Sequence, residues 1–319
     1  LFFQNQAMNP IFRNLLATTF ASVSLLAGAA HAAEPLPVPV TASFSILGDL
    51  VRVVGGERVR VTTLVGPDED AHAFTPKPAD ARAIVQTRLL VINGLGFEPW
   101  AQKLANSSGY QGATLVASQG VKPRLMPEEK GHDRSGHDNH QHDETDPHAW
   151  QNPENVVLYV RNIAAALGKA DPAGSAIYQA NSVAYVKELQ ALDAWTQAQF
   201  AAIPVAKRKV ITSHDAFGYF AAHYQISFLA PQGVSTDAEP SAKDVAQLIK
   251  QIQREKIKAV FVENMSNPKL LAQLARDAGV TVGPALYVDA LSAPGGPAGS
   301  YLQLMRHNVT QLAAGMRAN

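Results

Sequence analysis

The chain has 319 residues, of which 46% are hydrophobic and 17% charged, so it can bury a core and is neither disordered nor fibrous. Lys and Arg together number 27, as do Asp and Glu, so no basic excess favours binding to nucleic acid or anionic lipid. The absence of cysteine excludes disulfide scaffolds, cysteine-type zinc fingers, iron–sulfur sites and thiol nucleophiles. Ten histidines without any cysteine are the first compositional feature that points to function.

The amino-terminal region has the pattern of an export signal. Residues 1–32 combine a short vector or upstream remnant, a second possible start at Met8 and an apolar run over residues 15–30. This pattern predicts a signal peptide cleaved near Ala32/Ala33. A retained membrane anchor is the alternative, but a run of about 16 residues is short for a span of about 20. No cysteine follows the run, so lipid attachment there is excluded, and we expect a mature protein in a bacterial periplasm.

After this region, β-branched runs alternate with helical segments. The first half predicts strands over residues 38–44, 58–65, 89–93 and 113–117, with helices over residues 47–54, 78–86 and 99–106. The second half predicts strands over residues 209–212, 226–229, 259–262 and 281–288, with helices over residues 217–223, 242–255, 268–278 and 299–316. Such alternation is typical of a mostly parallel sheet covered by helices, so the sequence predicts two α/β lobes.

A long helical segment separates the two lobes. Asp171 is a suitable N-cap, Pro172 suits the first helical position, and no Gly or Pro interrupts residues 175–203. At about 1.5 Å per residue the segment would extend about 46 Å, and we expect one continuous helix rather than two shorter ones. The domains expected are an N-terminal lobe over residues 33–170, a linking helix over residues 171–203 and a C-terminal lobe over residues 204–319.

Residues 126–146 differ from the rest, because they contain one apolar residue and show no periodicity. We expect a mobile loop there. The segment contains four histidines: His132, His137, His140 and His142. Such clusters bind late first-row metals through imidazole nitrogen, and binding should be weak because the loop must lose conformational entropy. The alternative is a solvated polar loop without a role.

Three other histidines and one aspartate lie next to predicted elements. His72 follows a strand and a Gly-Pro turn, His148 precedes a helix that begins near Pro153, and His214 and Asp289 each follow a strand. Each histidine taken alone has an ordinary interpretation as a core or surface residue. Ligands in open α/β sheets gather at the carboxyl ends of strands, so the four residues are expected to converge on one cleft between the lobes. Three nitrogens and a carboxylate oxygen suit tetrahedral Zn²⁺.

These residues resemble the cluster A-I substrate-binding proteins of metal ABC transporters, the ZnuA-, AztC- and TroA-like group. The motifs that carry the resemblance are DAHAFTPKP around His72, DPHAW around His148, SHDAFGYF around His214, the helix start EPSAKD and the late VDALS. Together they span nearly the whole mature chain. The resemblance implies two (β/α)4 lobes with parallel-type sheets, joined by one long rigid helix, with the metal in the interlobe cleft.

The resemblance also implies a function and its ligands. Members of the family capture a metal with high affinity in the periplasm and deliver it to a membrane permease for import. The resemblance therefore implies a transport protein rather than an enzyme. Its four ligand positions match His72, His148, His214 and Asp289. Members similar to manganese carriers have a carboxylate where His214 stands, so His214 and the His-rich loop are typical of the zinc members. We therefore expect Zn(II), a permease, a monomeric chain, no nucleic acid, and a periplasmic zinc chaperone as a further partner.

Two departures from the family bear on the transporter subtype. Many ZnuA-like proteins have a cysteine pair in the second lobe, which this chain lacks. Ala71 precedes His72, where some members have a carboxylate, and Asp289 is present, which makes the ligand set more similar to AztC.

Two other functions are compatible with the sequence. A periplasmic zinc hydrolase would need an open coordination position and a general base, for which Glu263 is the candidate, although a structural hydrogen-bond acceptor is its more ordinary role. A periplasmic metal buffer or chaperone without a transporter is the other alternative. In every case, zinc affinity should fall below about pH 6.5, where imidazoles protonate.

Overall fold

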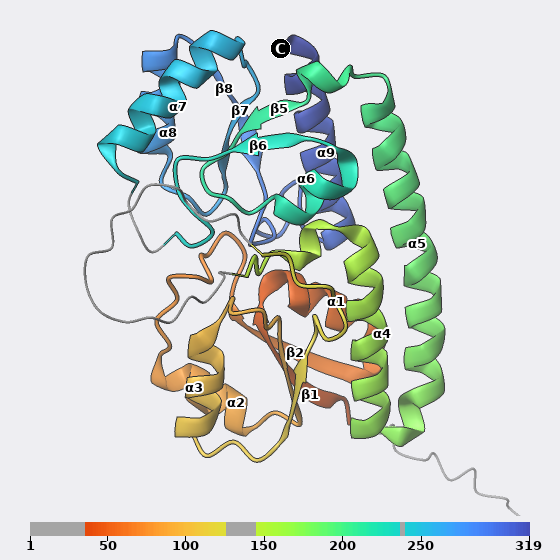
Figure 1. Cartoon of the computed structure of the whole chain (residues 1–319). Helices are drawn as coiled ribbons and strands as arrows, with labels where there is room; N and C mark the ends of the chain where they lie inside the picture. Colours follow the sequence, from red (N-terminus) through yellow and green to blue (C-terminus); the bar gives the residue numbers. More distant parts are fainter. Residues whose placement is uncertain (1–35, 126–144, 237–239) are drawn as a thin grey trace, which may run out of the picture. The chain divides into compact units, whose positions relative to one another are not determined.

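The computed structural model describes residues 36–125, 145–236 and 240–319 (Figure 1). The predicted signal peptide lies outside these residues, as do the four loop histidines His132, His137, His140 and His142. Within the described residues, no helix has both the length and the apolar character needed to cross a membrane.

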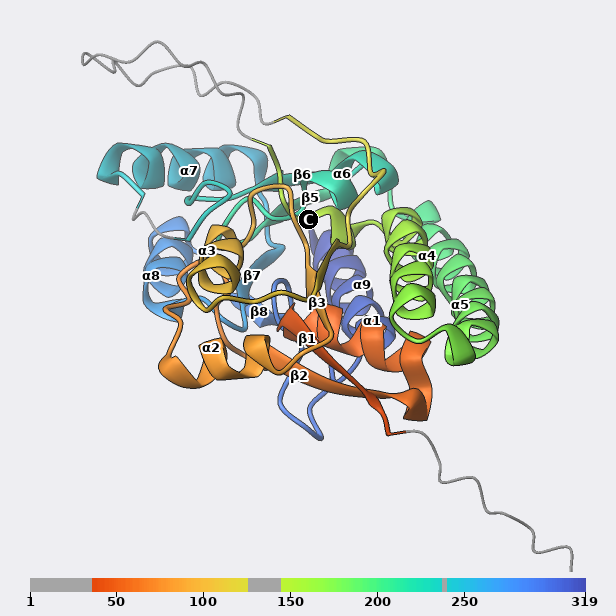
Figure 2. The same cartoon turned by 90° about the horizontal axis from the view of Figure 1, so that it is seen from below.

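The first lobe contains a four-stranded parallel sheet with strand order β2-β1-β3-β4. Its strands are β1 (Val38–Phe44), β2 (Val59–Val65), β3 (Leu89–Ile92) and β4 (Ala113–Val116). The connecting helices are α1 (Ser45–Gly55), α2 (Pro78–Val85) and α3 (Pro99–Ser107). Strand β1 is almost wholly buried because α1 covers one face of the sheet and α2 and α3 cover the other (Figure 2).

The second lobe repeats this arrangement with strand order β6-β5-β7-β8, again all parallel. Its strands are β5 (Lys209–Ile211), β6 (Ser227–Leu229), β7 (Val260–Glu263) and β8 (Val282–Leu286). Its helices are α6 (Gly218–Tyr224), α7 (Ala242–Glu255), α8 (Pro268–Ala278) and α9 (Tyr301–Ala318). The prediction of two four-stranded α/β lobes with parallel sheets is therefore confirmed.

Several helices begin where side-chain oxygens accept otherwise unpaired backbone amides. Asn152 caps α4 (Pro153–Ala170) by accepting from the amide of Glu154, and Ser241 caps α7 by accepting from the amide of Asp244. Pro153 at the first position of α4 has no amide to satisfy. These caps explain why sequence patterns place the helix starts well.

The long helix α5 (Ser175–Ala201) is continuous, as predicted, and contacts α1 and α4 of the first lobe and α9 of the second (Figure 1). It begins later than predicted because Pro172–Gly174 forms a separate 3₁₀ turn. The prediction that Asp171 caps it is wrong. The Asp171 carboxylate instead accepts from Arg58 Nε at 2.9 Å and from the Tyr178 hydroxyl at 2.6 Å.

The two lobes share one large hydrophobic core. It includes Phe44 and Leu89 from the first sheet, Phe261 and Leu286 from the second, and Leu189 from α5. Hydrogen bonds also join the lobes, because Trp150 Nε1 donates to the Val288 carbonyl at 2.9 Å and the Tyr301 hydroxyl donates to the Trp150 carbonyl at 2.8 Å. A shared core and shared helix oppose a wide hinge opening between the lobes.

Candidate metal centre

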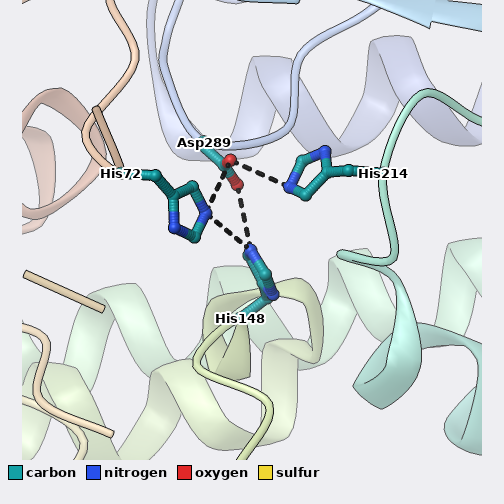
Figure 3. Close-up of side chains that lie close together, drawn as sticks. All are labelled: His72, His148, His214 and Asp289. Atoms are coloured by element: carbon teal, nitrogen blue, oxygen red, sulfur yellow. Dashed lines mark hydrogen bonds and ion pairs between the residues drawn. The ribbon is translucent and has the colours of Figure 1, made fainter. Parts of the chain in front are cut away.

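Four loops bring their side chains together between the two sheets. His72 follows β2, His148 precedes the 3₁₀ turn Ala149–Gln151, His214 follows β5 and Asp289 follows β8. One ligand atom from each residue lies within 4.8 Å of the other three (Figure 3). The structure therefore places all four sequence-predicted site residues in one cluster, with two contributed by each half of the chain.

The separations between these atoms suit a single ion. The Nε2 atoms of His72 and His148 are 3.2 Å apart, and His72 Nε2 lies 3.4 Å from Asp289 Oδ2. His148 Nε2 lies 3.7 Å from Asp289 Oδ1, and His214 Nε2 lies 3.2 Å from Asp289 Oδ2. A tetrahedral zinc with bonds of about 2.0–2.1 Å holds its ligand atoms roughly 3.3–3.4 Å apart. The observed spacing is close to that of a coordination shell.

The cluster is buried, and several of its polar atoms lack a hydrogen-bond partner. His148, His214 and Asp289 are fully buried, and the His72 side chain is 5% exposed. His214 Nε2 and both Asp289 oxygens have no hydrogen-bond partner, although His214 and Asp289 lie close together. Buried polar atoms without partners are costly, which indicates that these atoms are arranged to bind something else.

Carboxylates orient two of the imidazole rings. Asp146 Oδ1 lies 2.9 Å from His148 Nδ1, and a Glu263 oxygen is in close contact with His214 Nδ1. Glu263 also accepts from the backbone amides of Ser213 at 3.0 Å and His214 at 3.2 Å. When Nδ1–H donates to a carboxylate, Nε2 is left as the lone-pair donor, and these two Nε2 atoms face the centre of the cluster.

His72 is positioned mainly through its backbone. Its amide donates to Asp70 Oδ1 at 2.9 Å, and the carbonyl of Ala71 accepts from Trp100 Nε1 at 2.9 Å. The Phe97 ring packs against the imidazole with centroids 4.7 Å apart. From the second lobe, the Thr236 hydroxyl donates to Asp70 Oδ2 at 2.7 Å, so the loop that carries His72 is also linked to that lobe.

The buried charges shift the pKa values of two ligands, His214 and Asp289, in opposite directions. Burial alone would lower the pKa of His214, but the carboxylates of Glu263 and Asp289 outweigh this effect and raise it well above the ordinary value. Burial alone would raise the pKa of Asp289, but His214 and His148 lower it well below the ordinary value. Asp289 is therefore an anion in a site that favours positive charge.

The sequence patterns missed the residues that support His148. Asp146 Oδ2 lies 3.7 Å from Arg124 Nε, and Gly218 at the start of α6 leaves room for both groups. A Cβ at Gly218 would lie 2.3 Å from Asp146 Oδ2 and 2.4 Å from Arg124 Nε. Asn93, which follows β3 of the first lobe, also donates from its side chain to the Pro147 carbonyl at 2.9 Å. This hydrogen bond holds the segment that carries His148.

One local signal could have identified part of this support. In both Asp70-Ala71-His72 and Asp146-Pro147-His148, the aspartate oxygen accepts from the amide of the histidine two residues later, at 2.9 Å in each case. This side-chain turn is common for aspartate. The repeated D-x-H spacing therefore marks both histidines of the first lobe as held in fixed loops.

Comparison with known families gives a match over most of the chain. The model of the ZnuA family, described as the periplasmic zinc-uptake complex component A, matches residues 40–315. The match includes all four residues of the cluster.

Individual relatives differ in the metal that their names carry. The chain is similar to the manganese-binding lipoprotein MntA of Halalkalibacterium halodurans, at 31% identity over 279 residues, covering 87% of this chain and 88% of that protein. It is 29% identical over 313 residues to the iron-binding protein YfeA of Yersinia pestis, covering 96% of this chain and 97% of that protein. Its structure is similar to the periplasmic zinc binding protein TroA from Treponema pallidum, with a TM-score of 0.80 and 27% identity over 88% of this chain and 99% of that chain.

Proposed function

Because this chain belongs to the ZnuA family, the cluster A-I substrate-binding proteins of metal ABC transporters, we propose that its cargo is Zn²⁺. It captures the ion in the periplasm and delivers it to a membrane permease for import. His72, His148, His214 and Asp289 are the proposed ligands. We also propose, from the sequence alone, that the protein is a periplasmic monomer and that a zinc chaperone delivers the ion to it.

The donor set is the observation that supports zinc. Relatives of this chain are named for manganese, iron and zinc, so family membership alone does not select the metal. Three imidazole nitrogens and one carboxylate oxygen suit Zn²⁺, whereas Mn²⁺ prefers sites with more oxygen ligands. Neighbouring donor atoms lie 3.2–3.4 Å apart in three of the pairs, which is close to the separation of two ligand atoms on a tetrahedral zinc, and this spacing also supports Zn²⁺.

The same geometry favours a carrier over a hydrolase. Four protein ligands complete a tetrahedral shell and leave no position for an activated water. Glu263, the candidate base, is engaged with His214 and with the backbone of Ser213. A substrate-binding protein is therefore the function that both the family and the site support, and a metal buffer without a transporter has no separate observation in its favour.

Competition titration with a chromogenic zinc chelator tests the proposal. His148→Ala and His214→Ala should each lower zinc affinity by orders of magnitude, because each removes one ligand from a closed shell. His307→Ala is a matched control, since His307 lies on α9 with its Nε2 next to the Ala285 carbonyl rather than in the cluster. Wild-type affinity in both ligand variants would overturn the assignment.

A further inference from the structure

A second group of potential ligands lies on three helices outside the cluster. Glu154 is in the first turn of α4, Asp193 is on α5 and His223 is in the last turn of α6. One ligand atom of each lies within 4.8 Å of the other two, and within the described residues no further group of this kind accompanies the two clusters. His223 Nε2 lies 2.8 Å from Asp193 Oδ1, and its Nδ1 lies 3.7 Å from Glu154 Oε2.

The three side chains differ in how firmly they are held. Asp193 and His223 are mostly buried, at 16% and 17% exposure, whereas the Glu154 side chain is 68% exposed. Asp193 also accepts from the Tyr224 hydroxyl at 2.7 Å and from Gln197 Nε2 at 2.8 Å. The group therefore has two fixed donors and one mobile carboxylate that can move to meet an ion.

The group has an excess of negative charge. Among the described residues, no Lys or Arg forms an ion pair with Asp193 or Glu154, and His223 is the one basic side chain between them. Burial, and then the Asp193 and Glu154 carboxylates, raise the pKa of Tyr224 above its ordinary value. A divalent cation would balance two carboxylates and leave the imidazole neutral.

We propose that His223, Asp193 and Glu154 form a second, weaker divalent-cation site. One imidazole and two carboxylates suit Zn²⁺, with water completing the shell. Ligand atoms around such an ion lie roughly 3.3–3.4 Å apart, so the exposed Glu154 side chain must move toward the Nε2 side of the His223 ring. The 2.8 Å contact between His223 Nε2 and Asp193 Oδ1 must also widen as the ion replaces the ring proton. Partial exposure and only three protein ligands explain why the site is weaker than the buried cluster.

The position of this site gives it a consequence for release. Helix α4 packs on the sheet of the first lobe and follows the segment with His148, whereas α6 packs on β6 of the second lobe and follows His214. Figure 1 and Figure 2 both show α6 near α4, with α5 alongside. An ion bound by all three helices would hold the lobes together, so a second cation would slow dissociation of the first.

Zinc counting by equilibrium dialysis tests the site in the full chain. Under excess Zn²⁺, His223→Gln should bind one equivalent fewer than wild type and than the control His307→Gln, while all three retain tight binding. Glu154→Gln changes a side chain that is 68% exposed, and it should weaken this equivalent at least tenfold. In crystals soaked with excess zinc, an anomalous peak should lie between the three side chains.

The outcomes separate this site from the proposed function. If His223→Gln and Glu154→Gln both bind as many equivalents as wild type with unchanged affinities, or if no peak lies at the triad, the second site does not exist. Loss of tight binding in His148→Ala concerns the buried cluster alone. The dissociation rate of the first zinc from wild type should fall when excess zinc is present, and it should not respond in Glu154→Gln.

Discussion

Asp146 accepts two hydrogen bonds from His148, one from the backbone amide and one from ring Nδ1, both at 2.9 Å. The ring is therefore fixed in position and in tautomer before any ion arrives. Asp146 is itself fully buried and lies 3.7 Å from Arg124 Nε. Affinity for the metal should depend on this carboxylate even though it is not among the four ligands.

Asp146→Ala should lower zinc affinity by about 10–100-fold, because the His148 ring loses the group that orients it. Asp146→Asn keeps an acceptor oxygen of the same shape, so its loss should be smaller. Competition titration of the two variants measures the difference. Equal affinity in wild type and Asp146→Ala would show that backbone packing alone orients His148.

Zinc affinity should decrease as the pH falls, and the decrease should begin above pH 6.5. The ordinary histidine pKa alone predicts that zinc affinity falls only below that pH. The carboxylates of Glu263 and Asp289, however, raise the pKa of His214 well above its ordinary value. Zinc must displace the proton from this ring, so apparent affinity is already reduced where the ring remains protonated. Glu263→Gln removes one of the two carboxylates and should move the decrease to lower pH, as titrations at several pH values would measure. A pH profile unchanged by that substitution would contradict the electrostatic explanation.

The stability of the metal-free protein should show the matching linkage. A histidine with a raised pKa in the folded state stabilises the fold at pH values below its unfolded pKa of about 6.5, and this contribution is lost as pH rises through the folded pKa. The His214 contribution to the free energy of unfolding should therefore decrease above about pH 6.5. Chemical denaturation of wild type and His214→Gln without metal measures it as the difference between the two curves.

Gly218→Ala should destabilise the fold by about 1–3 kcal/mol, because the new methyl group would overlap Asp146 and Arg124. It should also lower zinc affinity through displacement of Asp146. Gly233→Ala is the matched control, since a Cβ there has no atom within 4 Å. Urea denaturation and zinc titration of both variants test the prediction, and equal stability of the two would contradict it.

Deletion of residues 128–144 should leave one tight zinc site and lower the number of equivalents bound under excess zinc. Leu125 and Thr145, which flank the segment, form an antiparallel bridge, so a short connection can replace it. The deletion removes the loop histidines while retaining all four proposed ligands. Loss of tight binding would mean that the primary site includes the loop.

Much of the fold could be predicted because local patterns determine its elements. Helix α7 has the predicted bounds, and its start depends on the single capping residue Ser241. Strand β8 ends at Leu286 rather than near residue 288, and the β7–β8 pairing shifts register beyond Phe261. The prediction for Asp171 is wrong because its partner Arg58 comes from the 3₁₀ turn Gly56–Arg58 that follows α1, and spacing along the chain does not reveal this contact.

The placement of His72, His214 and Asp289 could be predicted because each follows a strand, and ligands gather at the carboxyl ends of parallel strands. The family motifs mark these three positions and also His148. Their supporting residues could not be predicted in full. Glu263 reaches His214 across neighbouring strands, and Gly218 matters for the space that it leaves beside Asp146. Such contacts depend on how distant segments pack, which residue type and spacing do not determine.

If His72, His148, His214 and Asp289 bind a single zinc ion, crystals of the full chain grown with one equivalent of Zn²⁺ will show it, with diffraction data collected on both sides of the zinc edge. We expect one strong anomalous peak about 2.0–2.2 Å from three Nε2 atoms and an Asp289 oxygen. A dominant peak elsewhere, with these side chains beyond bonding distance of the ion, would contradict it.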